Sequence, residues 1–281
     1  MKSDIIYQRH EPFAELKNQI NYFWYMESEE GELQQTPDLL IPDGYPEIIF
    51  VLKGSYSKRT ISDSSRVEIV KASSVIGLQQ RSLLVKRNGA VRLIGIKFKP
   101  LGFYRCFGKK AVQTAGKTEG LKALEASWLL NLERQLKASD SLPQILELLN
   151  QSISSHTNVE SSLPNEAILE KCIEAIIGAN GNISLVNLEE KAGKGKRQIQ
   201  RYFKEYIGMS PKKFSSLIRF KSVYKQNVLS DAALGHFFDH GYFDQSHFIK
   251  DFRANLGITP SDSISQEFRA QNDIAKKSVR S

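Results

Sequence analysis

The sequence lacks most of what membrane, secreted and disulfide-bonded proteins require. No run of about 18 apolar residues occurs in the 281-residue chain, so we expect no segment that spans a membrane. Two cysteines, Cys106 and Cys172, are too few for a disulfide framework or a zinc cluster. The segment from Met1 to Pro12 is charged and does not have the form of a secretory signal. We therefore expect a cytoplasmic protein with no membrane partner.

Motifs for catalysis and for metal binding are also missing. Residues 1–118 contain a single histidine, His10, whereas a metal-binding barrel needs several clustered histidines. No glycine-rich phosphate loop and no nucleophile motif occurs. Asp43 and Glu47 resemble paired carboxylates, but we favour a turn residue and a strand-edge residue as their roles. The sequence predicts neither an enzyme nor a cofactor.

Positive charge is present in excess, and it is concentrated in one segment. The net charge is +8, and residues 191–225 hold eleven Lys or Arg and a single acid, Glu205. The rest of the chain has 28 basic and 30 acidic residues, so the whole excess comes from this segment. Such a stretch is either a solvated helix face or a phosphate-binding surface.

The first part of the chain has the pattern of short strands. Residues 47–52 form an apolar run between turn signals, and residues 66–70 alternate with period two. Residues 91–98 also alternate, with Leu93 on one face and Ile94 and Ile96 on the other. Short strands separated by Gly, Ser, Asp and Pro predict a small barrel or sandwich.

Helical periodicity replaces this pattern further along. Residues 121–136 predict an amphipathic helix that either pairs with a second chain or packs against its own barrel. A second helix begins at Leu142, and the polar segment 152–164 is the best linker. We therefore expect an α+β protein with a sensor and dimerisation domain over residues 1–155. An all-α domain over residues 165–268 follows.

An internal repeat occurs in this second domain. Residues 199–211 align with residues 248–260 at an offset of 49. Each copy begins with an apolar residue, and Phe and a basic residue follow after a gap of three. After two further residues come an apolar residue and Gly, and the copy ends with Ser-Pro or Thr-Pro one residue later. Gly208 and Gly257 suit the left-handed conformation that follows a helix end. Ser210 and Thr259, each followed by proline, are expected to cap the next helix.

A short helix is expected before each copy of the repeat. Residues 185–192 form the first, capped by Ser184 and broken by Gly193, and Lys196 opens the next helix. The equivalent short helix of the second copy begins near Asp231 and ends at Gly241, and Asp244 caps the helix that follows. A short helix, a glycine-containing turn and a second helix with a polar face predict a helix-turn-helix unit. The helix beginning at Pro211 would join the two units.

The polar faces of the two repeat helices have the chemistry of base reading. Arg and Gln form bidentate contacts with guanine and adenine edges, and Ile packs on a thymine methyl. A solvated helix face is the alternative for each residue alone, but two matched units in a basic setting favour DNA contact. The expected DNA-binding residues are Lys196, Arg197, Gln200, Arg201, Lys204, Gln245, Ser246, His247, Ile249 and Lys250.

Residues 241–248, with Phe252 and the Gly257–Pro260 segment, carry a family signature. This part of the chain resembles the AraC/XylS transcription regulators over residues 165–265. The resemblance implies two recognition helices in adjacent major grooves, with double-stranded DNA and RNA polymerase as partners. The chain departs from the family pattern at His236 and Phe237, where the family has smaller residues, so the packing of the second unit is expected to differ.

Residues 41–47 and 95–102 resemble the cupin-like sensor domain found in one branch of the same family. That resemblance implies a β-barrel with a pocket for a small-molecule effector, and helices that form a homodimer. The aromatic segment Tyr22 to Tyr25 either lines such a pocket or belongs to the core, and we favour the core. An alternative function is thiol-based alkylation sensing at Cys106, where Arg105, Lys109 and Lys110 would favour a thiolate.

Overall fold

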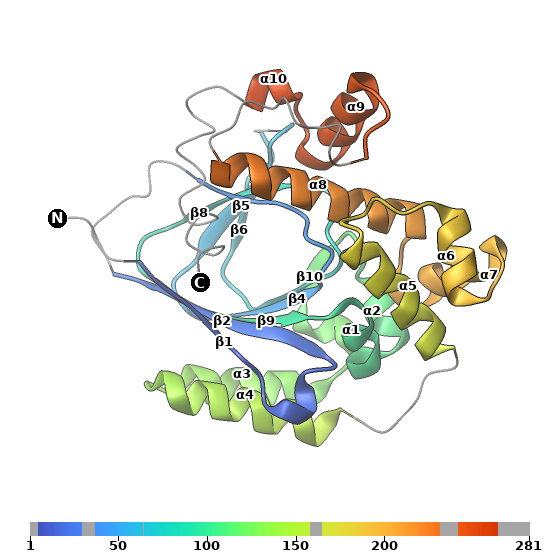
Figure 1. Ribbon diagram of the computed structural model, residues 1–281. Coiled ribbons are helices and arrows are strands. Elements are labelled where there is room, and N and C mark those ends of the chain that lie inside the picture. Colours follow the sequence, from blue (N-terminus) through green and yellow to red (C-terminus); the bar gives the residue numbers. More distant parts are fainter. Residues whose placement is uncertain (1–4, 30–36, 64, 158–164, 231–240, 264–281) are drawn as a thin grey trace.

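The computed structural model describes the chain outside residues 1–4, 30–36, 64, 158–164, 231–240 and 264–281, and it describes the backbone alone for residues 225–230. Two antiparallel sheets make up the first part of the protein, with helices packed on both sides (Figure 1). Helices alone make up the second part, and they lie against one side of the sheets. The expected α+β class is confirmed.

The larger sheet has six strands in the order β1-β2-β9-β4-β7-β10. Their bounds are β1 (Ile6–His10), β2 (Ile20–Ser28), β9 (Val91–Phe98), β4 (Glu47–Lys53), β7 (Ser74–Ile76) and β10 (Thr118–Gly120). The centre is β9, which pairs with β2 and with β4. Both faces of β9 are buried, because Ile94 faces one core cluster and Leu93 faces another.

The smaller sheet has four strands in the order β3-β8-β5-β6. Their bounds are β3 (Asp38–Leu40), β8 (Leu83–Arg87), β5 (Tyr56–Thr60) and β6 (Glu68–Val70). Tyr56 and Val70 face the larger sheet, whereas Leu39 and Leu84 face the C-terminal helices. The strands expected at 47–52 and 91–98 are therefore present, and the one expected at 66–70 is shorter. No strand pairing in the described residues joins the two sheets into a ring.

Two helices cover the outer face of the larger sheet, α3 (Ser127–Lys137) and α4 (Leu142–His156) (Figure 1). Leu129, Leu132 and Leu136 are buried in one cluster with sheet residues, so the amphipathic face packs on its own sheet. The prediction of a single helix over residues 121–136 is wrong. A 3₁₀ turn, η2 (Leu121–Leu124), comes first, and Glu125 with φ 52° separates it from α3. Helix α4 also continues into the segment predicted to be linker.

Three short helices complete the first part of the chain. A 3₁₀ turn, η1 (Ala14–Leu16), precedes β2, and α1 (Pro100–Phe107) and α2 (Lys109–Gln113) follow β9. Proline at the start of α1 suits the first turn of a helix, where its missing N–H is not needed. Phe103 and Phe107 of α1 pack against Phe98, which fixes α1 to the end of the sheet.

The C-terminal part is entirely helical within the described residues. Its elements are α5 (Glu166–Gly178), α6 (Leu185–Ala192), α7 (Lys196–Tyr202), the π-helical turn η3 (Phe203–Ile207), α8 (Pro211–Ser230), α9 (Gln245–Leu256) and α10 (Pro260–Ser263). The long α8 crosses above the sheets and joins the two helical groups (Figure 1). None of the described helices combines the length and apolar character needed to cross a bilayer.

Candidate nucleic-acid interface

The first helix-turn-helix unit consists of α6 and of α7 continued by η3. Ser184 caps α6, because its hydroxyl accepts from the Asn187 backbone N–H at 3.1 Å. Gly193, with φ 60°, ends α6 in the left-handed conformation, as the sequence predicted. Ile199 and Phe203 are buried against the core of the unit. These caps and apolar positions hold the second helix at a fixed angle to the first.

The opposite face of this second helix is open. All five residues that the sequence predicts to contact DNA are exposed, and none of their side chains forms a salt bridge with a described acid. They are Lys196, Arg197, Gln200, Arg201 and Lys204. The Arg201 guanidinium lies 5.4 Å from the centre of the Tyr202 ring, which supports its stem at the surface. The structure therefore gathers the five predicted residues on one accessible helix.

The second unit is described from Gly241 onward. Asp244 caps α9, since its carboxylate accepts from the His247 backbone N–H at 2.6 Å. Phe248 and Phe252 are buried, at the positions equivalent to Ile199 and Phe203. The predicted short helix of this unit, with His236 and Phe237, lies outside the described residues.

The predicted DNA-facing residues of α9 are mostly accessible. Exposed side chains belong to Gln245, Ser246, His247 and Lys250. Ile249 is half-buried, because it packs against the core cluster that contains Phe248 and Phe252. The His247 ring lies edge-on to Tyr242, with 5.2 Å between ring centres.

A polar junction between α8 and α9 was not predicted from the sequence. The Asp251 carboxylate accepts from the Ser216 hydroxyl and, at 3.0 Å, from the Tyr242 hydroxyl. It also lies 3.7 Å from Nε of Arg219. Lys213 of α8 donates to the Asn255 side chain at 3.3 Å. Because these groups are largely buried, they fix the angle of α9 on α8. The sequence feature that could have indicated this junction is Asp251, an acid between the basic residues Lys250 and Arg253.

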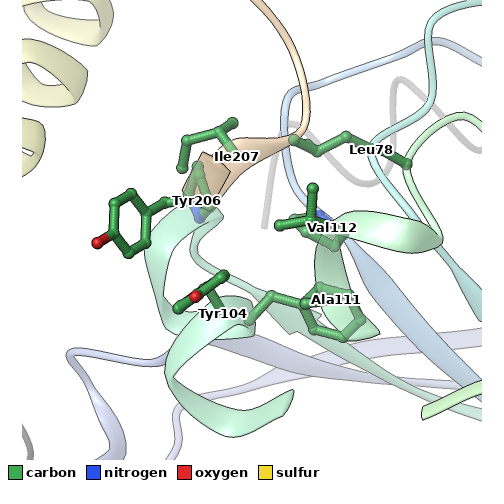
Figure 2. Close-up of a pocket in the computed structure, with 10 residues that line it drawn as sticks. Leu78, Tyr104, Ala111, Val112, Tyr206 and Ile207 are labelled. Atoms are coloured by element: carbon green, nitrogen blue, oxygen red, sulfur yellow. The ribbon is translucent and has the colours of Figure 1, made fainter. Parts of the chain in front are cut away.

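The first unit rests on the N-terminal part through apolar and aromatic contacts. Figure 2 shows Tyr206 and Ile207 facing Tyr104, Ala111, Val112 and Leu78 across a small gap. The rings of Tyr104 and Tyr206 meet edge-on, with 4.8 Å between their centres. A Cβ added at Gly208 would lie 2.8 Å from the Cβ of Ala115, so glycine is required here by the close approach as well as by φ 84°. We call these contacts of Tyr206, Ile207 and Gly208 the first seat.

The second unit rests on the smaller sheet through polar contacts as well as apolar ones. The backbone N–H and the hydroxyl of Ser82 both donate to the Asn255 carbonyl, at 2.8 and 3.0 Å. Leu39 and Leu84 pack with Phe252 in one core cluster. A Cβ added at Gly257 would lie 3.5 Å from Ser62. We call these contacts of Asn255 and Gly257 the second seat.

A buried charge cluster links the sheet to α8. The Lys97 ammonium lies 3.1 Å from Asp43 and 3.3 Å from Glu47. Asp43 also accepts from the Tyr45 backbone N–H at 3.1 Å, which is the expected turn role. Lys221 of α8 lies over the Tyr45 ring, 4.8 Å from its centre. The sharing of one lysine by Asp43 and Glu47 was not predicted from the sequence.

The electrostatics of this cluster favour charged side chains. Burial by itself disfavours the ionised form of Asp43, but Lys97 and Lys221 outweigh it, so the pKa of Asp43 falls below its usual value. Burial likewise opposes the charge on Lys97, but Asp43 and Glu47 raise the pKa of Lys97 well above its usual value. Asp43 and Lys97 are therefore both charged at neutral pH.

The structure does not support the alternative of a thiolate at Cys106, which is a partly buried cysteine packed against the main core. Burial against the main core raises the pKa of the Cys106 thiol to about 12, and the opposing effect of Arg105 is smaller. Arg105 forms salt bridges with Glu166 and Glu170, and Lys110 forms one with Glu125, so these basic groups pair with carboxylates. The thiol is therefore protonated at neutral pH. No group of His, Cys, Asp and Glu side chains within the described residues is placed to hold a metal ion.

Two family models match the chain. Residues 188–266 match a helix-turn-helix domain, and residues 8–119 match a domain of unknown function (DUF6597). No curated protein matches. The chain is a DNA-binding transcription regulator. The match to a helix-turn-helix domain over residues 188–266 agrees with the two units predicted from the sequence.

Solved structures with a similar arrangement include ToxT from Vibrio cholerae O395, with 13% identity and a TM-score of 0.41, covering 93% of this chain and 97% of that one. ToxT from Vibrio cholerae strain SCE256 with a bound unsaturated fatty acid has 11% identity and a TM-score of 0.42, covering 93% and 96%. The AraC-like transcriptional activator CuxR has 11% identity and a TM-score of 0.29, covering 74% and 77%.

Proposed function

We propose that this regulator reads a specific promoter sequence through α7 and α9, under the control of a small-molecule effector bound by its N-terminal part. One observation carries the proposal. Both recognition helices are held at their C-terminal ends by the N-terminal part, whereas their polar faces stay open. A change in the N-terminal part would therefore move the reading faces without blocking them.

The chemistry of the exposed face supports the assignment of roles. Arg197, Gln200 and Arg201 would contact base edges, and Lys196 and Lys204 would contact phosphates, which supply affinity independent of sequence. In the second unit Gln245, Ser246 and His247 would enter the groove first, with Lys250 and Ile249 one turn further along. Residues 1–155 and 165–268 would act as the sensing and DNA-binding domains, and a homodimer and RNA polymerase are further proposed partners.

The proposal is tested by selecting binding sites for the full-length protein from a random duplex library. We expect two half-sites separated by about one helical turn, roughly 10 base pairs. Arg201→Ala should weaken binding to the selected site by about 1–3 kcal/mol, roughly 5- to 150-fold, with little effect on random DNA. The control is Lys212→Ala, since this exposed lysine at the start of α8 should weaken both alike. Equal losses on both DNAs for Arg201→Ala would contradict base reading.

A further inference from the structure

A cleft lined by polar, charged and apolar side chains opens where residues 58–68 of the smaller sheet meet residues 79–83 and 115–118. Its volume is about 940 Å³, within the range of small-molecule sites. One wall is the end of the smaller sheet, at β5 and β6. The other wall comes from residues 79–81, before β8, and residues 115–118, before β10. The cleft is therefore a candidate for the effector site, and its assignment rests on the proposed function.

The charge of the cleft selects the class of ligand. Lys58 is 6% exposed, and its ammonium lies 3.2 Å from the exposed Glu68. Burial lowers the pKa of Lys58, and Glu68 opposes this effect. An ammonium has three donors, and the one described partner leaves donors for a second acceptor. Arg59, Arg66 and Arg81 also line the cleft, together with the acids Asp63 and Glu68, so the lining holds four basic and two acidic side chains.

The remaining lining is hydrophilic. Thr60, Thr118, Gln79 and Gln80 offer hydroxyl and amide groups. Three apolar side chains, those of Val67, Leu83 and Ala115, also line the cleft. The polar and charged groups of this lining suit an anion that also carries hydroxyl groups.

The rim of this cleft is shared with both seats. Ala115, which lines the cleft, is the residue that Gly208 of the first seat approaches. Ser62, which also lines the cleft, is the residue that Gly257 of the second seat approaches. Arg81 directly precedes Ser82, whose N–H and hydroxyl hold the Asn255 carbonyl. A ligand in the cleft would thus touch the supports of both recognition helices.

The second seat carries a repulsion that an anion would relieve. Lys213 of α8 is half-buried, and the positive charge of Arg81 is close enough to disfavour the charged form of Lys213. The pKa of Lys213 is lowered, chiefly because the side chain is buried. The charge of Asp251 opposes this shift, and the charge of Arg81 adds to it. An anion bound beside Arg81 would offset this repulsion and tighten the hold of Ser82 on Asn255.

We propose that the cleft lined by Lys58, Arg66 and Arg81 binds a small hydrophilic anion, phosphorylated or carboxylated, and that this anion sets the positions of both recognition helices through their seats. The anionic group binds between Lys58 and the two arginines. The hydroxyl groups of the ligand bind the threonine and glutamine side chains. Occupancy stabilises the contacts of Ser82 and Ala115 with the two units.

The test measures binding of pyrophosphate and of citrate to the full-length protein by calorimetry, at constant ionic strength. We expect saturable binding of at least one anion, weakened about tenfold or more by Lys58→Met and by Arg81→Gln. Pyrophosphate alone would indicate a phosphorylated ligand, and citrate alone a carboxylated one. Lys53→Met, at the exposed end of β4, is the matched control and should bind as the unmodified protein does.

A second control separates this site from the DNA-binding face. The double variant Arg197→Gln, Arg201→Gln should still bind the anion, although it no longer selects a DNA sequence. In hydrogen exchange, the anion should slow the Ser82 amide and residues 115–118. Three outcomes would overturn the proposal. The anion could still bind to Lys58→Met and Arg81→Gln, its binding could be lost only in the double variant, or neither anion could bind. Failure to select a DNA site would instead contradict the proposed function.

Discussion

The two helix-turn-helix units bury equivalent positions of the repeat, each in its own core cluster, but they differ in how they are seated on the N-terminal part. Tyr202 and Tyr206 of the first unit occupy the repeat positions of Asp251 and Asn255 in the second. The first pair gives an aromatic contact with Tyr104, and the second pair gives a polar network with Ser216, Tyr242 and Ser82. One repeat thus supports two kinds of junction, because the residues at these two positions differ in polarity.

This difference has a functional consequence. An aromatic contact is held by burial of apolar area and tolerates small displacements, whereas hydrogen bonds weaken steeply with distance and angle. The second seat is therefore the more sensitive of the two to a change in the sheet. We expect an effector to act on the second unit more strongly than on the first.

The largest expected effect on stability concerns the equivalent buried phenylalanines of the two units. Phe203→Ala and Phe252→Ala each remove a ring that is at most 2% exposed, and each should lower the free energy of unfolding by about 3–5 kcal/mol. Urea denaturation of the full-length protein measures both. Similar losses would agree with equivalent buried positions in the two units, and a loss confined to one variant would contradict that equivalence.

A smaller effect is expected where the units differ. Asp251→Asn replaces the charged acceptor of the polar junction and should lower the free energy of unfolding by about 1–3 kcal/mol. Its repeat counterpart, Tyr202→Phe, removes one hydrogen bond from Gln198 at 2.7 Å and should cost about 1 kcal/mol or less. Urea denaturation compares the two, and an equal or larger loss for Tyr202→Phe would refute the contrast between the junctions.

The smallest effect is a change in how stability depends on pH. The lowered pKa of Asp43 means that its carboxylate contributes stability above its unfolded value of about 3.8, and this contribution is lost as the pH falls through the folded pKa. Asp43→Asn should therefore flatten the fall in unfolding free energy below about pH 4. Asp140→Asn, at a fully exposed side chain, is the control and should leave the slope unchanged. Equal slopes for Asp43→Asn and the unmodified protein would argue against the ion cluster as a stabilising contact.

Local features of the fold could be predicted from the sequence. The caps at Ser184 and Asp244 and the glycine ends at Gly193 and Gly208 occur where the sequence places them, because each depends on a few neighbouring residues. The error at residues 121–136 also has a local cause, since the left-handed Glu125 interrupts a run whose apolar spacing remained helical.

Long-range contacts could not be predicted in the same way. The sharing of Lys97 by Asp43 and Glu47 depends on the pairing of β4 with β9, and no local pattern specifies that register. The two seats depend on contacts between residues of different domains, and the periodicity within either domain carries no information about them. That the predicted DNA-contacting residues share a helix face follows from the helical spacing within each of the two repeat helices, and their contact with DNA stays a prediction.

The hydrogen bond from the Ser82 hydroxyl to the Asn255 carbonyl joins residues 173 positions apart. Closing so long a segment of chain costs entropy that is repaid only when both ends are already ordered. This contact should therefore form late in folding, after the sheet and α9 exist. During synthesis the sheet is made first and α9 last, so the orientation of the second recognition helix is among the last features of the native protein to be established.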